Sequence, residues 1–199
     1  GLEAVQSRED DLKSLCAAFG TTSSAPMLHI RGHTPDEYPR ILSRLKQIEI
    51  TTHDLKDLWK KFNCGLNRID LVAIGSPHAS LAECKNFADF LEGKQCSATT
   101  RTIVTVGRET LTQITNTGII ERLKKCGVQV IPDICWCSIT EPIFPVKTEV
   151  VMTNSGKFAH YGKALTGRDL RFGSLKDCAT ASLQGYLKSD LPSWLVSDT

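Results

Sequence analysis

The sequence lacks a strong excess of charge, a long apolar run and a leader-like start. Its 199 residues carry a formal net charge of only +2 at pH 7, whereas a nucleic-acid or membrane surface needs a clustered basic face. No apolar run approaches the roughly 20 residues that a transmembrane helix requires. No basic segment followed by an apolar one opens the sequence, as it would in a signal peptide. We therefore expect a cytoplasmic protein that binds neither nucleic acid nor a membrane.

Paired C-x₂₋₄-C spacing, which is typical of zinc sites, is also missing. A disulfide framework is expected in small secreted domains with weak cores, but 41% of these residues are hydrophobic, enough for a sizeable core. We expect most of the cysteines to be reduced core residues, although one of them can still serve as a metal ligand. The eight cysteines are scattered: Cys16, Cys64, Cys84, Cys96, Cys126, Cys135, Cys137 and Cys178.

Apolar runs alternate with amphipathic segments along the chain. The pattern predicts strands over 27–30, 69–74, 102–106, 128–131 and 150–152. It predicts helices over 10–19, 55–62, 81–91, 110–126 and 174–185, with capping signals at residues 51, 80, 110 and 174. This alternation indicates an α/β fold, a mostly parallel sheet with helices on both faces, as in three-layer folds. We expect a single domain over 1–199, in which 189–199 form a tail that packs loosely or serves as an interface arm.

The carboxyl ends of parallel strands meet at one edge of a sheet, where ligands of open α/β folds bind. That edge would collect residues 75–78, 107–108, 133–137 and 153–157. The segment 153–161 (TNSGKFAHY) is the most suggestive, because Ser155, Gly156 and Lys157 offer an anion a hydroxyl, close backbone approach and a positive charge. It lacks the spacing of a P-loop. The alternative is a glycine turn anchored by Phe158 and Tyr161.

Three other segments are weaker candidates. In residues 75–80 (GSPHAS), Ser76 and His78 offer a donor and a general acid or base at a helix N-terminus; alternatively, Ser80 caps the helix and His78 is an exposed loop residue. Cys135 follows a strand, where a thiolate suits an iron–sulfur cluster, but its spacing to Cys137 favours a pair of small residues near a tryptophan, because no multi-cysteine cluster motif is present. Residues 29–35 (HIRGHTP) place two histidines beside an arginine, a pattern more often structural.

In this order, the segments 29–35, 75–80, 133–135 (DIC), 153–161 and 173–178 (GSLKDC) resemble the C-terminal part of the aconitase X family. The resemblance extends from the first predicted helix to Gly185. It implies an aconitase-like domain of an iron-dependent hydro-lyase, which dehydrates a small hydroxy acid. Among the family's substrates, cis-3-hydroxy-L-proline is the first expectation and mevalonate 5-phosphate the alternative.

The resemblance also implies roles for individual residues. Cys135 would be a ligand of an iron–sulfur cluster, whereas Ser76 stands where other members have a cysteine, which leaves the cluster type open. His78 and Ser155 would be catalytic. The residues implied to bind the substrate are Ser76, Thr153, Asn154, Ser155 and Lys157.

Family members contain a large N-terminal part and a small swivelling domain or subunit. We expect both to be required partners of this chain, which alone would hold an incomplete cluster site and be inactive. One alternative is a non-catalytic domain that has kept the fold and lost the cluster. Another is a flavodoxin-like module for a phosphorylated ligand, although the sequence has no nucleotide motif.

Overall fold

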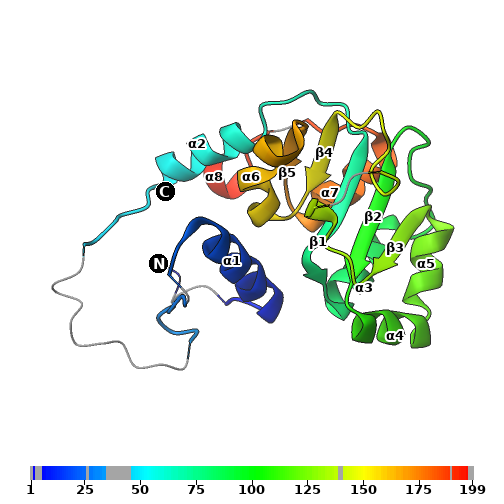
Figure 1. Cartoon of the computed structure of the whole chain (residues 1–199), viewed down its shortest axis with the longest axis horizontal. Coiled ribbons are helices and arrows are strands. Elements are labelled where there is room, and N and C mark those ends of the chain that lie inside the picture. The colour runs from blue at the N-terminus through cyan, green and yellow to red at the C-terminus, as the bar shows by residue number, and fades with distance from the viewer. Residues whose placement is uncertain are drawn as a thin grey trace.

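The computed structural model describes residues 2, 6–25, 27–34, 46–138, 141–188 and 190–196 (Figure 1). Its centre is a sheet of five strands in the order β3-β2-β1-β4-β5, and every neighbouring pair is parallel. The strand order reverses between β1 and β4, which makes that position the switch point of a doubly wound sheet. The strands are β1 (Leu71–Ala79), β2 (Arg101–Val106), β3 (Val128–Pro132), β4 (Val150–Thr153) and β5 (Asp169–Phe172).

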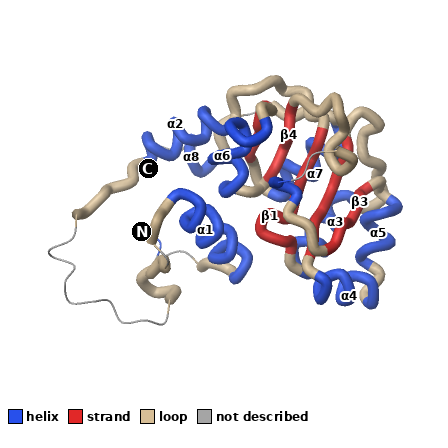
Figure 2. Tube along the Cα trace, viewed as in Figure 1, coloured by secondary structure: helices blue, strands red, loops and turns tan. Residues whose placement is uncertain are grey.

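The predicted α/β class is confirmed, with helices on both faces of the sheet (Figure 2). The helices include α2 (Thr52–Phe62) and α8 (Ser193–Val196), and residues Trp136–Ser138 form a short 3-10 helix, η3. None of the helices in the described part of the chain combines the length and hydropathy of a membrane span. The other helices are α1 (Glu9–Thr22), α3 (Leu81–Leu91), α4 (Arg108–Asn116), α5 (Ile119–Lys125), α6 (Gly156–Thr166) and α7 (Leu175–Gln184).

Two apolar layers hold the sheet, because alternate strand residues point to opposite faces. Val72 and Met152 belong to the layer formed with α3, α5 and α7. Leu71 and Val151 belong to the opposite layer, which includes Phe158 of α6 and the aromatic residues of the loop after β3. Helix α1 packs against α6 and β1, and it lies beside the sheet together with α2 (Figure 1).

Three of the predicted capping arrangements are confirmed. The Ser80 hydroxyl accepts a hydrogen bond from Glu83 N at 3.1 Å, and Glu83 Oε2 accepts one from Ser80 N. The same reciprocal bonds join residues 51 and 54 at α2 and residues 174 and 177 at α7. These caps are local in sequence, so they can be predicted without knowing the fold.

The cap predicted at Thr110 is wrong. Helix α4 begins two residues earlier, at Arg108, with Gly107 as its N-cap. The predicted single helix is also divided, because Gly118 adopts a left-handed backbone (φ 71°) and separates α4 from α5. The predicted end is right, since Gly127 follows the C-cap of α5 with a positive φ of 92°.

The strand predicted over residues 27–30 is also wrong, because those residues form no strand. The carbonyl of Ile30 instead accepts hydrogen bonds from the amides of His33 and Thr34 in a local turn. Three elements were missed, α6, β5 and the short helix α8 inside the expected tail. The first turn of α6 is polar enough to resemble a loop, and β5 carries Arg171 in the middle of a short run.

Arg171 is buried, with an exposed fraction of 2%. Its guanidinium donates to the carbonyls of Asn63 (2.7 Å), Leu66 (2.8 Å) and Gly65, and to Asn67 Oδ1 (2.7 Å). These acceptors all lie on the segment that joins α2 to β1. One side chain of the sheet therefore fastens this connection to β5.

Candidate functional site

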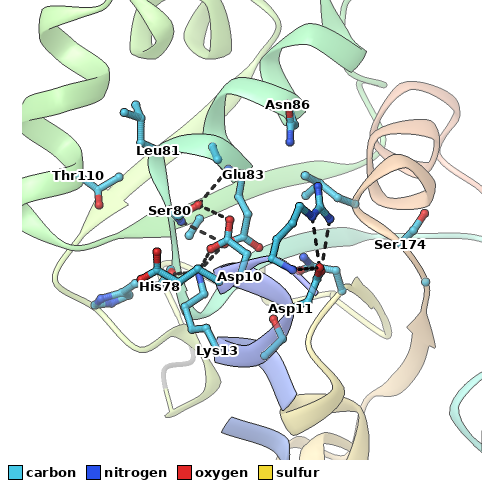
Figure 3. Close-up of a pocket in the computed structure, with 18 of the residues that line it drawn as sticks. Asp10, Asp11, Lys13, His78, Ser80, Leu81, Glu83, Asn86, Thr110 and Ser174 are labelled. Atoms are coloured by element: carbon cyan, nitrogen blue, oxygen red, sulfur yellow. Dashed lines mark hydrogen bonds and ion pairs between the residues drawn. The ribbon is translucent and has the colours of Figure 1, made fainter. Parts of the chain in front are cut away.

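An open cleft of about 1390 Å³ lies at the carboxyl edge of the sheet. The N-terminal turns of α1, α3, α4 and α7 contribute to its walls (Figure 3). Asn154, after β4, also lines it. Strand β1 pairs with β4 only through its first two residues, Leu71 with Val151 and Val72 with Met152. The strand ends therefore meet at one edge of the sheet, as predicted. The cleft opens at the switch point between β1 and β4.

His78 stands in the cleft at the end of β1. Its Nε2 lies 3.1 Å from the carbonyl oxygen of Ile134. A carbonyl can only accept, so Nε2 carries the proton and Nδ1 holds the lone pair of the neutral imidazole. Gly107 is the neighbour of this nitrogen, since a Cβ there would make an ordinary van der Waals contact with Nδ1 at 3.8 Å. In this tautomer His78, which lines the cleft, has Nδ1 as its basic atom.

The strand that carries His78 bends at Gly75, where the backbone has a φ of 104°. A Cβ at this position would come within 2.2 Å of the carbonyl oxygen of Thr105, so only glycine fits. The pairing of β1 with β2 is irregular between Ile74 and Ala79 as a result. After this bulge His78 reaches the cleft whereas Ser76 stays buried, in keeping with the role of bulges beside functional sites.

The segment 153–161 is the end of β4 and the start of α6 instead of a loop. Ser155 is the N-cap of α6: its Oγ accepts from Phe158 N at 3.1 Å and donates to the carbonyl of Ser76. Thr153 Oγ1 accepts from Ser155 N at 3.1 Å. Both hydroxyls are buried and hold backbone, whereas Asn154 faces the cleft. Lys157 is half-buried in the first turn of α6, outside the cleft lining.

A polar cluster lies behind the end of β1. The buried Cys137 thiol donates to Ser76 Oγ at 2.8 Å, and Tyr161 also hydrogen-bonds this thiol. Burial raises the pKa of Cys137, and the bonds to Ser76 and Tyr161 oppose that rise. Burial also raises the pKa of Tyr161. Cys135, by contrast, is exposed.

The cluster offers only part of a metal site. Within the described ranges of the chain, no three His, Cys, Asp or Glu side chains gather closely enough to hold a metal ion. Cys135 and Cys137 supply two sulfurs, and Ser76 supplies a hydroxyl where a thiolate would bind more strongly. The residues that the structure describes therefore do not by themselves form a complete iron–sulfur site.

Arg108 is a cleft residue that was not singled out as a candidate from the sequence. It follows Gly107 at the start of α4, and its Nη2 lies 2.6 Å from Asp133 Oδ2. Asp133 itself has a left-handed backbone (φ 57°), which aims its carboxylate across the end of the sheet. The guanidinium is 85% exposed and offers a planar, always charged donor group to an anion. Its position after a strand end was the signal that could have identified it.

The histidines of residues 29–34 lie outside the cleft lining. His33 instead lines a separate cavity of about 150 Å³, where Nδ1 is 2.8 Å from Ser7 Oγ and Nε2 is 2.7 Å from the carbonyl of Leu2. Pro35, the last residue of that motif, lies outside the described residues.

Comparison with known proteins matches residues 69–184 to the aconitase X third domain and residues 1–60 to the aconitase X second domain. The chain is 38% identical over 204 residues to the cis-3-hydroxy-L-proline dehydratase of Hypocrea jecorina. The aligned region covers 99% of this chain and 34% of that protein. The chain is 36% identical over 205 residues to the Pseudomonas aeruginosa enzyme of the same name, covering 100% and 35%. The chain therefore spans about a third of the length of these relatives.

Two further similarities involve an archaeon. The phosphomevalonate dehydratase large subunit of Thermococcus kodakarensis is 32% identical over 152 residues, or 75% of this chain and 38% of that protein. The solved structure of Thermococcus kodakaraensis aconitase X in its holo form superposes with a TM-score of 0.73 at 28% identity. That superposition covers 88% of this chain and 44% of the other.

Proposed function

Since this chain belongs to the aconitase X family, we propose that it is part of a hydro-lyase that dehydrates cis-3-hydroxy-L-proline. The observation that carries the proposal is His78, which lines an open cleft at the switch point of the sheet and is held there through Nε2. The substrate is proposed from the two relatives that match along nearly the whole chain, both named cis-3-hydroxy-L-proline dehydratase.

The proposed reaction is an elimination. His78 Nδ1 removes the proton from the substrate carbon that bears the carboxylate, and the electron pair of that C–H bond forms the new carbon–carbon double bond. The C–O bond of the neighbouring carbon breaks, and its electron pair leaves with the oxygen as hydroxide. The hydroxide becomes water by taking the proton from the imidazolium, so the base is restored.

The carboxylate of the substrate needs cationic and N–H donors. Arg108 offers a guanidinium at the N-terminus of α4, where the amides and the helix dipole also favour an anion. We keep Asn154, which lines the cleft, and Lys157, which lies outside its lining, as proposed substrate ligands. For Ser76, Thr153 and Ser155 the contacts support a positioning role, because their hydroxyls bond a neighbouring thiol or the backbone. Ser155 would then act through the carbonyl of Ser76 instead of on the substrate.

We propose Cys135 as this chain's ligand to an iron–sulfur cluster whose remaining ligands come from outside the described residues. Its exposed thiol can be approached from another part of the protein, unlike that of Cys137. A bound cluster would supply a Lewis acid for the departing oxygen. We also propose cytoplasm as the location, since thiolate-held clusters and free thiols suit a reducing compartment.

The partners proposed are the missing N-terminal part and a small swivelling domain or subunit. The cleft is open and the chain spans about a third of its relatives, so other domains would have to close the site. We therefore propose that residues 1–199 alone are inactive, as one domain of the larger enzyme.

The test is turnover by the full-length protein with two substrates. We expect consumption of cis-3-hydroxy-L-proline and none of mevalonate 5-phosphate; the reverse result would identify the alternative dehydratase. Iron analysis of the same sample separates both from a non-catalytic domain, which would hold no iron and act on neither substrate. Cys135→Ser should lower the bound iron, whereas Cys16→Ser, at an exposed cysteine of α1, should not.

A further inference from the structure

A closed ring of polar contacts joins the first turn of α1 to the first turn of α3 (Figure 3). Lys13 Nζ lies 2.8 Å from Asp10 Oδ1 and 2.6 Å from Glu83 Oε2. The other oxygen of Asp10 accepts a hydrogen bond from Ser80 Oγ at 2.7 Å. Ser80 and Glu83 are themselves bonded as the capping box of α3. The ring thus ties together two segments that are 70 residues apart in sequence.

Lys13 also reaches the backbone of the proposed base. An ammonium has three donors, and Lys13 uses the third on the carbonyl oxygen of His78, at 3.1 Å. The imidazole of His78 is held on its other side by the carbonyl of Ile134. The backbone of His78 is therefore held from α1, and its imidazole from the loop after β3.

The ring is more than a surface ion pair. The side chains of Lys13, Asp10 and Glu83 are 29%, 23% and 16% exposed, so water screens their charges only in part. Burial alone would lower the pKa of Lys13, but the bonds to Asp10 and Glu83 outweigh it and raise that pKa. Both partners of the lysine therefore help to keep it charged at neutral pH.

Helix α1 also packs against α6 and β1, but this packing buries little of it. None of its residues is fully buried, so apolar burial holds it less firmly than it holds α3 or α7. The segment also belongs to residues 1–60, which match a different domain of the family from the sheet. The contact between the two matched ranges at the cleft consequently depends on polar bonds with defined geometry.

We infer that Lys13 is a positioning residue of the candidate site: together with Asp10 it fixes α1 against the N-terminus of α3 and sets the direction of His78 in the cleft. Its kinetic consequence rests on the proposed function, whereas the ring itself does not.

The kinetic test compares three variants of the full-length protein acting on cis-3-hydroxy-L-proline. Lys13→Met should lower kcat by roughly 10- to 100-fold with little change in KM, because small displacements near the reacting atoms cost about that much. Lys13→Arg should regain most of the rate, since a guanidinium still donates to several acceptors. Lys85→Met is the matched control, because Lys85 bonds Asp89 on α3 at 2.7 Å. A Lys13→Met enzyme with unchanged kcat, or one no slower than the control, would overturn the inference.

Two measurements need no turnover. A double-mutant cycle of Lys13→Met and Glu83→Gln should show a coupling of at least about fivefold in the unfolding equilibrium constant. The imidazole resonances of His78 should shift in Lys13→Met and stay in place in Lys85→Met. Independent single effects together with an unmoved His78 resonance would refute the inference. If the unaltered protein dehydrates no hydroxy acid, the proposed function fails, and these two measurements decide the inference by themselves.

Discussion

Replacing Arg171 by methionine should cost this fold more stability than any exposed arginine does. The guanidinium donates to three carbonyls and one side-chain oxygen of the segment between α2 and β1. Each of these hydrogen bonds is worth about 1 kcal/mol net, and a buried carbonyl left without a donor costs about 1–3 kcal/mol. Water can reach the carbonyl of the exposed Leu66 but not that of the buried Asn63. We therefore expect the free energy of unfolding to fall by about 3–5 kcal/mol in total.

Urea unfolding followed by far-UV circular dichroism measures this loss. Arg122→Met is the matched control, because Arg122 pairs with Asp89 and Glu92 at the helix surface, where such pairs are worth about 0–1 kcal/mol. Arg171→Lys should recover only part of the lost stability, because the lysine ammonium lacks the planar fork of donors of a guanidinium. If Arg171→Met were no less stable than Arg122→Met, the view that this side chain fastens the connection to β5 would be refuted.

Three further predictions follow from the site. Gly75→Ala should destabilise the protein by several kcal/mol in thermal unfolding, because the new Cβ would collide with the carbonyl of Thr105. A loss of stability below about 1 kcal/mol would contradict the claim that only glycine fits at this bulge. Burial raises the pKa of Asp10, but its bonds to Lys13 and Ser80 outweigh this effect and hold that pKa below 3.8. The wild type should therefore be more stable than Asp10→Asn above pH 3.8, and this difference should disappear as the pH falls through the lowered pKa. A stability difference that stays constant with pH would contradict this prediction. Iodoacetamide at pH 8 should label Cys135 but spare Cys137, as mass spectrometry can verify, since burial raises the pKa of Cys137; equal labelling would be inconsistent with the buried thiol.

The sequence was most informative where the deciding contacts are local. The apolar run of β1 and the capping signals of α2, α3 and α7 depend on residues within four positions of one another, and each is confirmed. It was least informative for β5. Arg171 resembles a surface residue until its acceptors, more than 100 residues away, are brought beside it.

The candidate site divides in the same way. That the ends of parallel strands would meet at one edge was predicted from the fold class alone, and His78 and Asn154 are found there. Asp10 and Lys13 could not be predicted, because nothing in their own helix indicates that they reach the capping box of α3. The partnership of Cys137 with Ser76 likewise crosses 61 residues.

The central claim is that His78 is the base of a hydro-lyase. The most direct measurement is proton NMR of cis-3-hydroxy-L-proline incubated with the full-length protein, its His78→Gln variant and a His53→Gln control, at an exposed histidine of α2. We predict that wild type and control consume the substrate while His78→Gln is slower by at least about 100-fold. Equal rates for His78→Gln and wild type would contradict the claim.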